Sequence, residues 1–217
     1  IDVSLVGSEM CIRDSTDTKG NDLAPPENVR IYHWASAQHV GNPLQERPIR
    51  GICQNPENVL QTSMIFRALL DALDNWVSKA ITPPENQIPT NSKGTLVDFE
   101  YWKSQFPKIP NLVTPQAPNK LSIYDYGPKA DLGIFDTLPP RKIQNCNYTV
   151  KVPSVDDDGN ELAGIRVPML GTPLATYTGW NIRSRNFGEG AMHEFSGSTL
   201  IFPETDAVRR MTNDPRK

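Results

Sequence analysis

The 217-residue chain lacks both an excess of basic charge and any long apolar run. Its 22 Lys and Arg side chains are outnumbered by 25 Asp and Glu, and its isoelectric point is about 5.6. A surface without a basic excess does not attract phosphate backbones, so nucleic acid is not an expected partner. No stretch approaches the roughly 18 to 20 apolar residues that cross a bilayer, and we expect no membrane span.

Cysteine is scarce as well. The chain has three, Cys11, Cys53 and Cys146, which are too few for a disulfide framework or for a four-cysteine metal site. A single bridge between Cys53 and Cys146 is left open, without support from the spacing. The cysteine count therefore does not decide the compartment, and the localisation stays unknown.

The chain also lacks a nucleophile elbow. No serine has glycine two residues before and two residues after it, although this Gly-x-Ser-x-Gly turn exposes the nucleophile of esterases and lipases. If the protein is a serine hydrolase, we expect its nucleophile in a part of the gene upstream of this chain.

The first 14 residues are set apart as an artefactual leader. Their sequence, Asp2-Val-Ser-Leu-Val-Gly-Ser-Glu-Met-Cys-Ile-Arg-Asp14, resembles the peptide produced when sequencing-adapter DNA is translated with an environmental gene fragment. It has no basic start, no sustained apolar segment and no small-residue cleavage site, so it is not a signal peptide. We predict that the natural protein begins well upstream.

The stretch from Val29 to Val40 contains the candidate catalytic residue. Val29 to Trp34 is β-branched and aromatic with polar residues interleaved, which predicts a strand of about six residues. The small residues Ala35-Ser-Ala-Gln follow, and His39 comes on the turn after them. Ligands and reactive side chains gather at the carboxyl ends of strands in open α/β sheets, and an imidazole exchanges protons near neutral pH. A lone histidine in such a loop is also compatible with a surface or packing role.

One strong helix is predicted from Pro56 to Lys79. Asn55 is a suitable N-cap, Pro56 a suitable first helical residue, and Glu57 an acid in the first turn. Apolar residues recur every three or four positions from Val59 to Val77, which is typical of a helix packed along one face, with Arg67, Asp71 and Asp74 on its solvated side. Pro83-Pro84 ends it.

The region from 89 to 217 is predicted to be a proline-rich extension of loops and short strands. Short strands are expected at 94–97 and 147–153, and a strand at 162–168 is expected to form a hairpin-like unit with the latter across the Asp156–Asn160 turn. An aromatic stretch at 173–181 should pack against a neighbour, and a last helix capped by Thr205 is expected near the end. Together these predict three parts: 1–14, 15–88 and 89–217.

The spacing of the acidic residues and histidines does not predict a metal site. Asp156-Asp-Asp-Gly-Asn160 invites a calcium-loop interpretation, but the glycine comes at the fourth position and no glutamate stands at the twelfth, so a turn is favoured. His33, His39 and His193 lack the spacing of a zinc site. His33 is most simply a half-buried packing residue and His193 a loop residue. Trp180, Asn181 and Arg183 could contact a ligand, although an aromatic residue there is more typical of packing. We expect no metal and no cofactor.

Several of these segments, in their order and spacing, resemble the C-terminal part of a bacterial α/β-hydrolase-domain family. The quoted stretches are Arg30-Ile-Tyr-His-Trp-Ala-Ser-Ala-Gln-His39, Arg67-Ala-Leu-Leu-Asp-Ala-Leu-Asp-Asn-Trp-Val77, Pro83-Pro84, Gly94-Thr-Leu-Val97, Val152-Pro-Ser-Val-Asp-Asp-Asp-Gly-Asn-Glu161, Gly164-Ile-Arg-Val-Pro168 and Pro173-Leu-Ala-Thr-Tyr-Thr-Gly-Trp-Asn181.

The resemblance implies an α/β fold in which 29–34 is the last strand of the hydrolase sheet, 56–79 the closing helix and His39 the triad histidine. The serine and the acid would precede Ser15, and the small-molecule substrate would be a carboxylic ester. The chain has Ala35-Ser-Ala-Gln where the family would place a glycine near the histidine. The alternative is a non-catalytic binding or structural module whose C-terminal region recognises a partner. The oligomeric state is not predicted.

Overall fold

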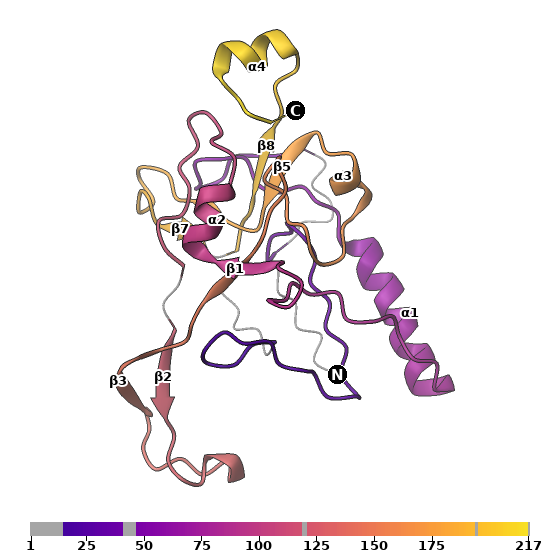
Figure 1. Cartoon of the computed structure of the whole chain (residues 1–217), viewed down its shortest axis with the longest axis vertical. Coiled ribbons are helices and arrows are strands. Elements are labelled where there is room, and N and C mark those ends of the chain that lie inside the picture. The colour runs from indigo at the N-terminus through magenta and orange to yellow at the C-terminus, as the bar shows by residue number, and fades with distance from the viewer. Residues whose placement is uncertain (1–14, 41–46, 119–120, 194, 217) are drawn as a thin grey trace.

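The computed structural model describes residues 15–40, 47–118, 121–193 and 195–216, so the leader predicted at 1–14 lies outside the described residues. Short helices and short strands are interspersed with α1, the one long helix, along this part of the chain (Figure 1). The helices are α1 Ser63–Lys79, α2 Phe99–Gln105, the 3₁₀ turn η1 Ala130–Leu132, α3 Pro168–Gly171 and α4 Asp206–Thr212. The strands are β1 Leu96–Asp98, β2 Ser122–Asp125, β3 Arg141–Asn147, β4 Lys151–Pro153, β5 Ala175–Thr178, β6 Asn181–Ile182, β7 Met192–His193 and β8 Ser198–Ile201.

The strands of the described residues pair into four small antiparallel sheets: β1 with β4, β2 with β3, β5 with β8 and β6 with β7. The β5–β8 pair is the most buried, with Ala175 opposite Ile201 and Thr178 opposite Ser198, and all four residues of β5 are buried. This confirms that the aromatic stretch at 173–181 packs against a neighbour.

The strand predicted at 29–34 is not continuous. Tyr32 and Trp34 each form a single parallel bridge, to Gln87 and to Ile165. The two partners come from different segments. Each partner segment forms only one or two backbone hydrogen bonds with the stretch, so no continuous ladder forms. The side-chain pattern was read correctly as core-directed, because Trp34 is only 6% exposed.

The helix predicted from Pro56 begins later, at Ser63, and ends at Lys79 as predicted. Cys53 and Glu57 form antiparallel bridges with Arg183 and Ser198, which hold the chain extended where the local signals favoured a helical turn. Arg67, Asp71 and Asp74 are exposed, as predicted for the solvated side of the helix.

The predicted hairpin of 147–153 with 162–168 is confirmed only close to its turn. β4 pairs with β1, Ile165 bridges to Trp34, and only Val155 and Glu161 pair across the turn. Gly159 takes a φ of +81° there, as the turn interpretation requires. The last helix is confirmed as α4, whose N-cap Thr205 accepts a hydrogen bond from the Val208 backbone N–H.

Two hydrophobic clusters form the core. The first joins the 34–37 segment and α1 to α3 and β5, and therefore draws on both sides of the boundary predicted at residue 88. Its buried members are Trp34, Ala35, Ala37, Leu60, Ile65, Val167, Leu170, Ala175 and Tyr177. The second cluster packs α2 against β4 and β6 through Phe99, Trp102, Phe106, Val152, Trp180 and Ile182.

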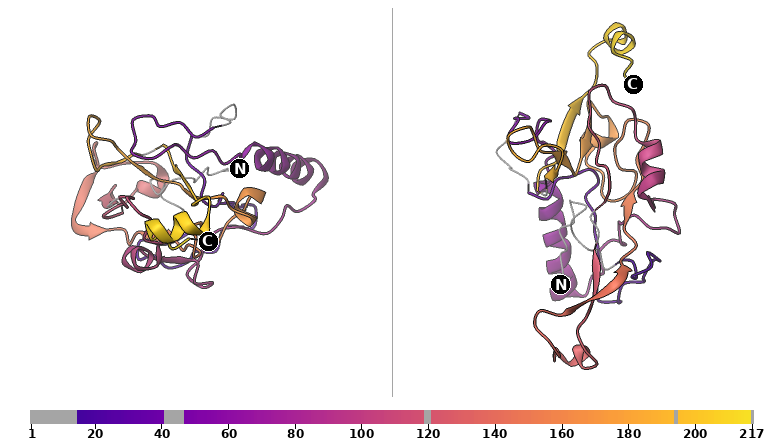
Figure 2. Two further views of the ribbon diagram at one scale, coloured as in Figure 1. Left: turned by 90° about the horizontal axis from the view of Figure 1, so that it is seen from above. Right: turned by 90° about the vertical axis from the view of Figure 1, so that its left-hand side faces the viewer.

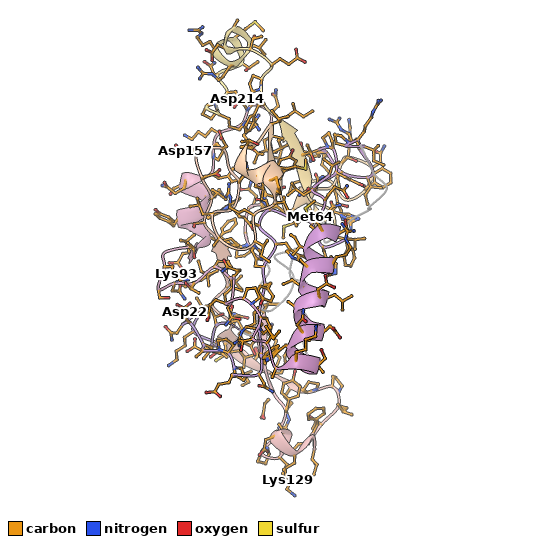
Figure 3. All side chains as sticks on the ribbon, turned by 90° about the vertical axis from the view of Figure 1, so that its right-hand side faces the viewer. Asp22, Met64, Lys93, Lys129, Asp157 and Asp214 are labelled. Atoms are coloured by element: carbon orange, nitrogen blue, oxygen red, sulfur yellow. The ribbon has the colours of Figure 1, made fainter. Side chains whose placement is uncertain are left out.

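Two parts project from this body at opposite ends, the β2–β3 arm and α4 (Figures 1 and 2). Every residue of β3 is exposed, and Lys129 lies near the far end of the arm (Figure 3). α1 runs along one flank of the body with Met64 at its first turn (Figure 3). No helix among the described residues is long and apolar enough to cross a membrane.

Candidate functional site

The turn that leads to His39 is built around Ser36. This residue is fully buried and takes a φ of 56°, the left-handed region that favours glycine. The small side chains of Ala35 and Ala37 on either side are buried as well, so the chain can turn inside the core. The left-handed residue lies in the stretch where the family resemblance led us to expect a glycine.

Glu161, which is distant in the sequence, anchors this turn. Its carboxylate Oε2 accepts the Ser36 backbone N–H at 2.7 Å and lies 2.6 Å from Nε2 of His33, while its own backbone N–H donates to Ser36 Oγ at 2.8 Å. Arg166 donates to the Glu161 carbonyl and lies 3.1 Å from the Asp156 carboxylate. These contacts tie the 33–36 segment to the turn at 156–161, more than 120 residues away.

Two further groups complete the scaffold of the turn. Asn58, which is 3% exposed, donates its amide N–H groups to the Ser36 carbonyl at 2.6 Å and to the Thr178 carbonyl at 2.9 Å. Gly164 has a φ of +102°, and a Cβ there would come within 2.5 Å of the His33 carbonyl oxygen. The site therefore depends on a close backbone approach that only glycine allows.

Serine, histidine and glutamate are the residue types of a hydrolase triad, but here they are arranged as a structural network. The Ser36 hydroxyl accepts a backbone N–H and has no exposed surface, so an ester cannot reach it. A catalytic serine instead needs an exposed hydroxyl that can pass its proton to a base. We therefore assign Ser36, His33 and Glu161 to holding the turn. His33 is fully buried, which corrects the half-buried placement expected for it.

His39 lies three residues beyond this turn and is half-buried. Its ring packs against Phe195, with centroids 5.3 Å apart and planes tilted by 54°. On either side of it, Gln38 accepts the Gly197 N–H through its side chain at 2.9 Å, and the Val40 N–H donates to the Phe195 carbonyl at 3.2 Å. The chain is thus held on both sides of His39, while the residue itself is only half-buried.

The segment that faces His39 is itself held tightly to β5 and to Asn58. A Cβ on Gly197 would lie 1.9 Å from the Thr178 carbonyl oxygen, so the two backbones can approach this closely only at a glycine. Phe195 is 49% exposed. Phe195 therefore lies beside His39 at the surface of the molecule, two residues before the point where the chain is packed against β5.

The remaining residues singled out from the sequence have other surroundings. His193 lies in β7 and accepts the Ser196 N–H at 3.1 Å, so it is not the loop residue that was expected. Trp180 is buried in the second core cluster, and Asn181 donates to the Asn55 and Gly197 carbonyls, so both serve packing.

The other possible sites were metals and a disulfide. Asp156 accepts the Asp158 and Asn160 backbone N–H groups, which closes the turn at 156–160. Within the described residues no group of three or more His, Cys, Asp or Glu side chains is arranged to hold a metal. Cys53, which is buried, and Cys146, which is exposed, are both free, so they form no bridge with each other. Burial raises the pKa of the Cys53 thiol.

The sequence singles out His39 as the candidate site residue, and it does not reveal Glu161, Asn58 or the supporting role of Ser36. Glu161 lies 125 residues from Ser36, and nothing in the local pattern around it signals a buried partner. The one available signal was the family's glycine near the histidine, which marks a backbone position of unusual φ.

The comparisons with known proteins agree with the resemblance of the sequence. A family model described as Alpha/beta hydrolase domain matches residues 5–211, and the match therefore begins within the stretch set apart as a leader. No curated protein and no solved structure matched the chain. Because the family model covers nearly the whole sequence and includes the His39 turn with the network around it, the chain belongs to the Alpha/beta hydrolase domain family.

Proposed function

We propose that His39 is the catalytic histidine of a serine hydrolase that acts on carboxylic esters. A serine oxygen attacks the ester carbonyl while His39 takes the hydroxyl proton, and His39 returns that proton to the departing alcohol as the ester C–O bond breaks. Water, again deprotonated by His39, then releases the acid from the acyl-enzyme. This chemistry needs no cofactor.

The observation that carries the proposal is the placement of His39 in a chain of this family. The imidazole is half-buried, stands at the end of a turn that Glu161 and Asn58 hold in a left-handed conformation, and is backed by Phe195. A general base must keep a fixed orientation and still reach solvent and substrate. A histidine that only packed in the core would need no such support for its loop.

The serine and the orienting carboxylate are proposed to lie upstream, in a longer natural protein. Two features support this: the sequence holds no Gly-x-Ser-x-Gly, and the order along the chain in α/β-hydrolases is serine, acid, histidine. The chain would then supply the C-terminal end of the hydrolase core, with 89–217 as an extension whose role is open.

Recovery of the upstream coding sequence tests this proposal. We expect a Gly-x-Ser-x-Gly after a strand, followed by an Asp or Glu before His39. The absence of the motif would instead favour a non-catalytic binding module.

A second experiment uses the 217-residue chain alone. We expect no hydrolysis of short p-nitrophenyl esters by the purified chain, with the longer protein as the positive control. Turnover by the chain alone, retained in a Ser36→Ala variant, would show that the nucleophile is elsewhere in these residues and would contradict the upstream placement.

A further inference from the structure

The extended segment beside α1 is hydrogen-bonded along one of its two backbone edges. On that edge the Gln87 N–H donates to the Ile31 carbonyl at 3.1 Å, and the His33 N–H donates to the Gln87 carbonyl at 2.8 Å. Ile165 repeats this pattern between His33 and Ala35, at 2.7 and 3.1 Å. Successive residues of an extended chain direct their backbone groups to opposite sides, so the even-numbered residues face the other edge.

This second edge is open. Among the described residues, no hydrogen bond is made by the Arg30 carbonyl, by either backbone group of Tyr32 or by the Trp34 N–H. These four groups follow one another as acceptor, donor, acceptor and donor. Two residues of a parallel strand would satisfy all four, just as two residues satisfy the first edge. An unpaired edge of this kind is a template for a further strand.

The direction of that strand follows from the way the segment ends. The Trp34 carbonyl accepts the Ala37 N–H at 3.3 Å, where the chain begins to turn. An antiparallel partner opposite Trp34 would pair with both of its backbone groups, whereas a parallel partner needs only the N–H. The bridges on the first edge, at Tyr32 and Trp34, are both parallel. The pattern therefore favours a parallel strand.

An exposed apolar face of α1 borders the same segment. Arg30, Tyr32 and Trp34 share the lining of a cavity of about 280 Å³ with the helix. The apolar residues of α1 in this lining, apart from one alanine, are Phe66, Leu69, Leu70, Leu73 and Trp76. Leu70 is 65% exposed, and Ile65 is the one buried residue of α1, which lies wholly within the described residues. An apolar stripe this poorly covered is typical of a surface that packs on another element.

The width of a helix relates this face to the open edge. A helix with its side chains is about 10 Å across, whereas neighbouring strands lie about 4.8 Å apart. Since α1 packs over the extended segment, it also reaches over the space that a strand on the open edge would fill. Every second side chain of such a strand would face α1.

We propose that the open edge and the apolar face of α1 together dock a parallel β-strand from the upstream part of the natural protein. The inference rests on the longer protein of the proposed function, and it names the surface through which this chain joins the rest of that protein. The strand lies opposite Ile31 and His33, and its apolar side chains cover Phe66 and Leu70.

Amide hydrogen exchange followed by NMR tests the open edge. In the 217-residue chain we expect the unpaired Tyr32 N–H to exchange at least about 100-fold faster than the paired His33 N–H. In the longer protein both should be protected to a similar extent. A Tyr32 N–H that is as slow as that of His33 in the 217-residue chain, or that still exchanges fast in the longer protein, would overturn the proposal.

Leu70→Glu tests the apolar face of α1. Because Leu70 is 65% exposed, the substitution should leave the urea midpoint of the 217-residue chain unchanged. In the longer protein it should lower the midpoint by about 1 M or more, because it buries a charge against the docked strand. Val77→Glu is the matched control, since Val77 is 75% exposed on the same helix and does not line the cavity. Equal midpoints for the two variants of the longer protein would contradict the docking.

Other occupants of the edge give different results. A dimer of the 217-residue chain that Leu70→Glu converts to monomer in sedimentation would assign the surface to a second copy. Protection of the Tyr32 N–H that disappears on deletion of residues 1–14 would assign it to that segment. Either result overturns the proposal, and so does an upstream coding sequence that supplies no strand. Exchange and unfolding do not depend on turnover, so a docked strand in a longer protein without esterase activity would overturn the proposed function alone.

Discussion

Ser36 shows how one residue reconciles two demands of the His39 turn. The backbone needs a left-handed conformation, with φ at 56°, and the core needs an acceptor for the Glu161 N–H, which the serine hydroxyl provides at 2.8 Å. Glycine would meet the first demand and alanine would meet neither. Serine at this position therefore has a strained backbone conformation, but it makes a buried hydrogen bond.

This balance predicts an order of stability for two variants. Ser36→Ala should lower the free energy of unfolding by about 1 to 3 kcal/mol, because it leaves the Glu161 N–H without an acceptor and keeps the strained φ. Ser36→Gly also loses the bond but relieves the strain, so it should be about 1 kcal/mol more stable than Ser36→Ala. Urea denaturation measures both, and an alanine variant as stable as the glycine variant would contradict the left-handed assignment.

At the scale of single residues, the sequence can single out a candidate residue, but it does not reveal the long-range contacts of that residue. His39 could be singled out because a histidine after a core-directed stretch stands out locally. Glu161 could not, because its partnership with His33 and Ser36 arises only once the chain has folded back over more than 120 residues.

The start of α1 could not be predicted from local sequence either, because long-range contacts determine it. Asn55-Pro-Glu carries strong local signals for a helix start, yet the helix begins at Ser63. Cys53 and Glu57 form β-bridges with Arg183 and Ser198. The Asn58 side chain donates hydrogen bonds to two buried carbonyl oxygens. Tertiary contacts outweigh propensity here, since capping contributes only about 1 kcal/mol. The end at Lys79 was predictable because Pro83-Pro84 cannot continue a helix, and the left-handed C-cap at Ala80 closes the helix just before them.

Asn58 therefore provides the prediction at the scale of the element. In the structure its side chain donates to the Ser36 and Thr178 carbonyls and accepts the Leu60 N–H. Asn58→Ala should cost about 2 to 4 kcal/mol, as expected for the loss of several buried hydrogen bonds. Gln61→Ala, three residues on and half-buried, is the comparison. If α1 extended back to Pro56, both positions would be ordinary helical sites and both substitutions would cost less than about 1 kcal/mol.

At the scale of the whole molecule, the residues that follow α4 are hydrogen-bonded to the β5–β8 sheet. Arg216, which is 3% exposed, makes a two-pronged pair with Asp214 and also donates to the Thr176 hydroxyl and the Leu200 carbonyl. These contacts tie the segment after α4 to β5 and β8. Hydrogen bonding from Arg216 holds the pKa of Asp214 below its ordinary value of 3.8.

This pair predicts a pH dependence of stability. Because the pKa of Asp214 is lower in the folded chain than in the unfolded chain, its stabilisation is complete above about pH 4 and is lost as the pH falls through the folded pKa. Asp214→Asn should therefore be less stable than the parent chain by about 1.5 to 3 kcal/mol near pH 7. The difference should shrink below pH 4. Urea denaturation across this range measures it, and a difference that stays constant down to pH 3 would contradict the assignment.

Fold class was predictable from the sequence, whereas the arrangement of the sheets was not. The family followed from the resemblance of several segments, and the family match over residues 5–211 supports it. The pairing of β1 with β4, and of β5 with β8, depends on partners up to 57 residues apart, and short strands carry no local mark of their partner.

The most direct test of the proposed function is the turnover of a carboxylic ester by the proposed longer protein, with His39 replaced by alanine. His193→Asn, which keeps an acceptor for the Ser196 N–H, is the matched control. We expect His39→Ala to lower kcat by about three orders of magnitude or more, as loss of a triad member does, and the control to retain ordinary turnover. Near-normal kcat in His39→Ala would contradict the assignment of His39 as the catalytic base.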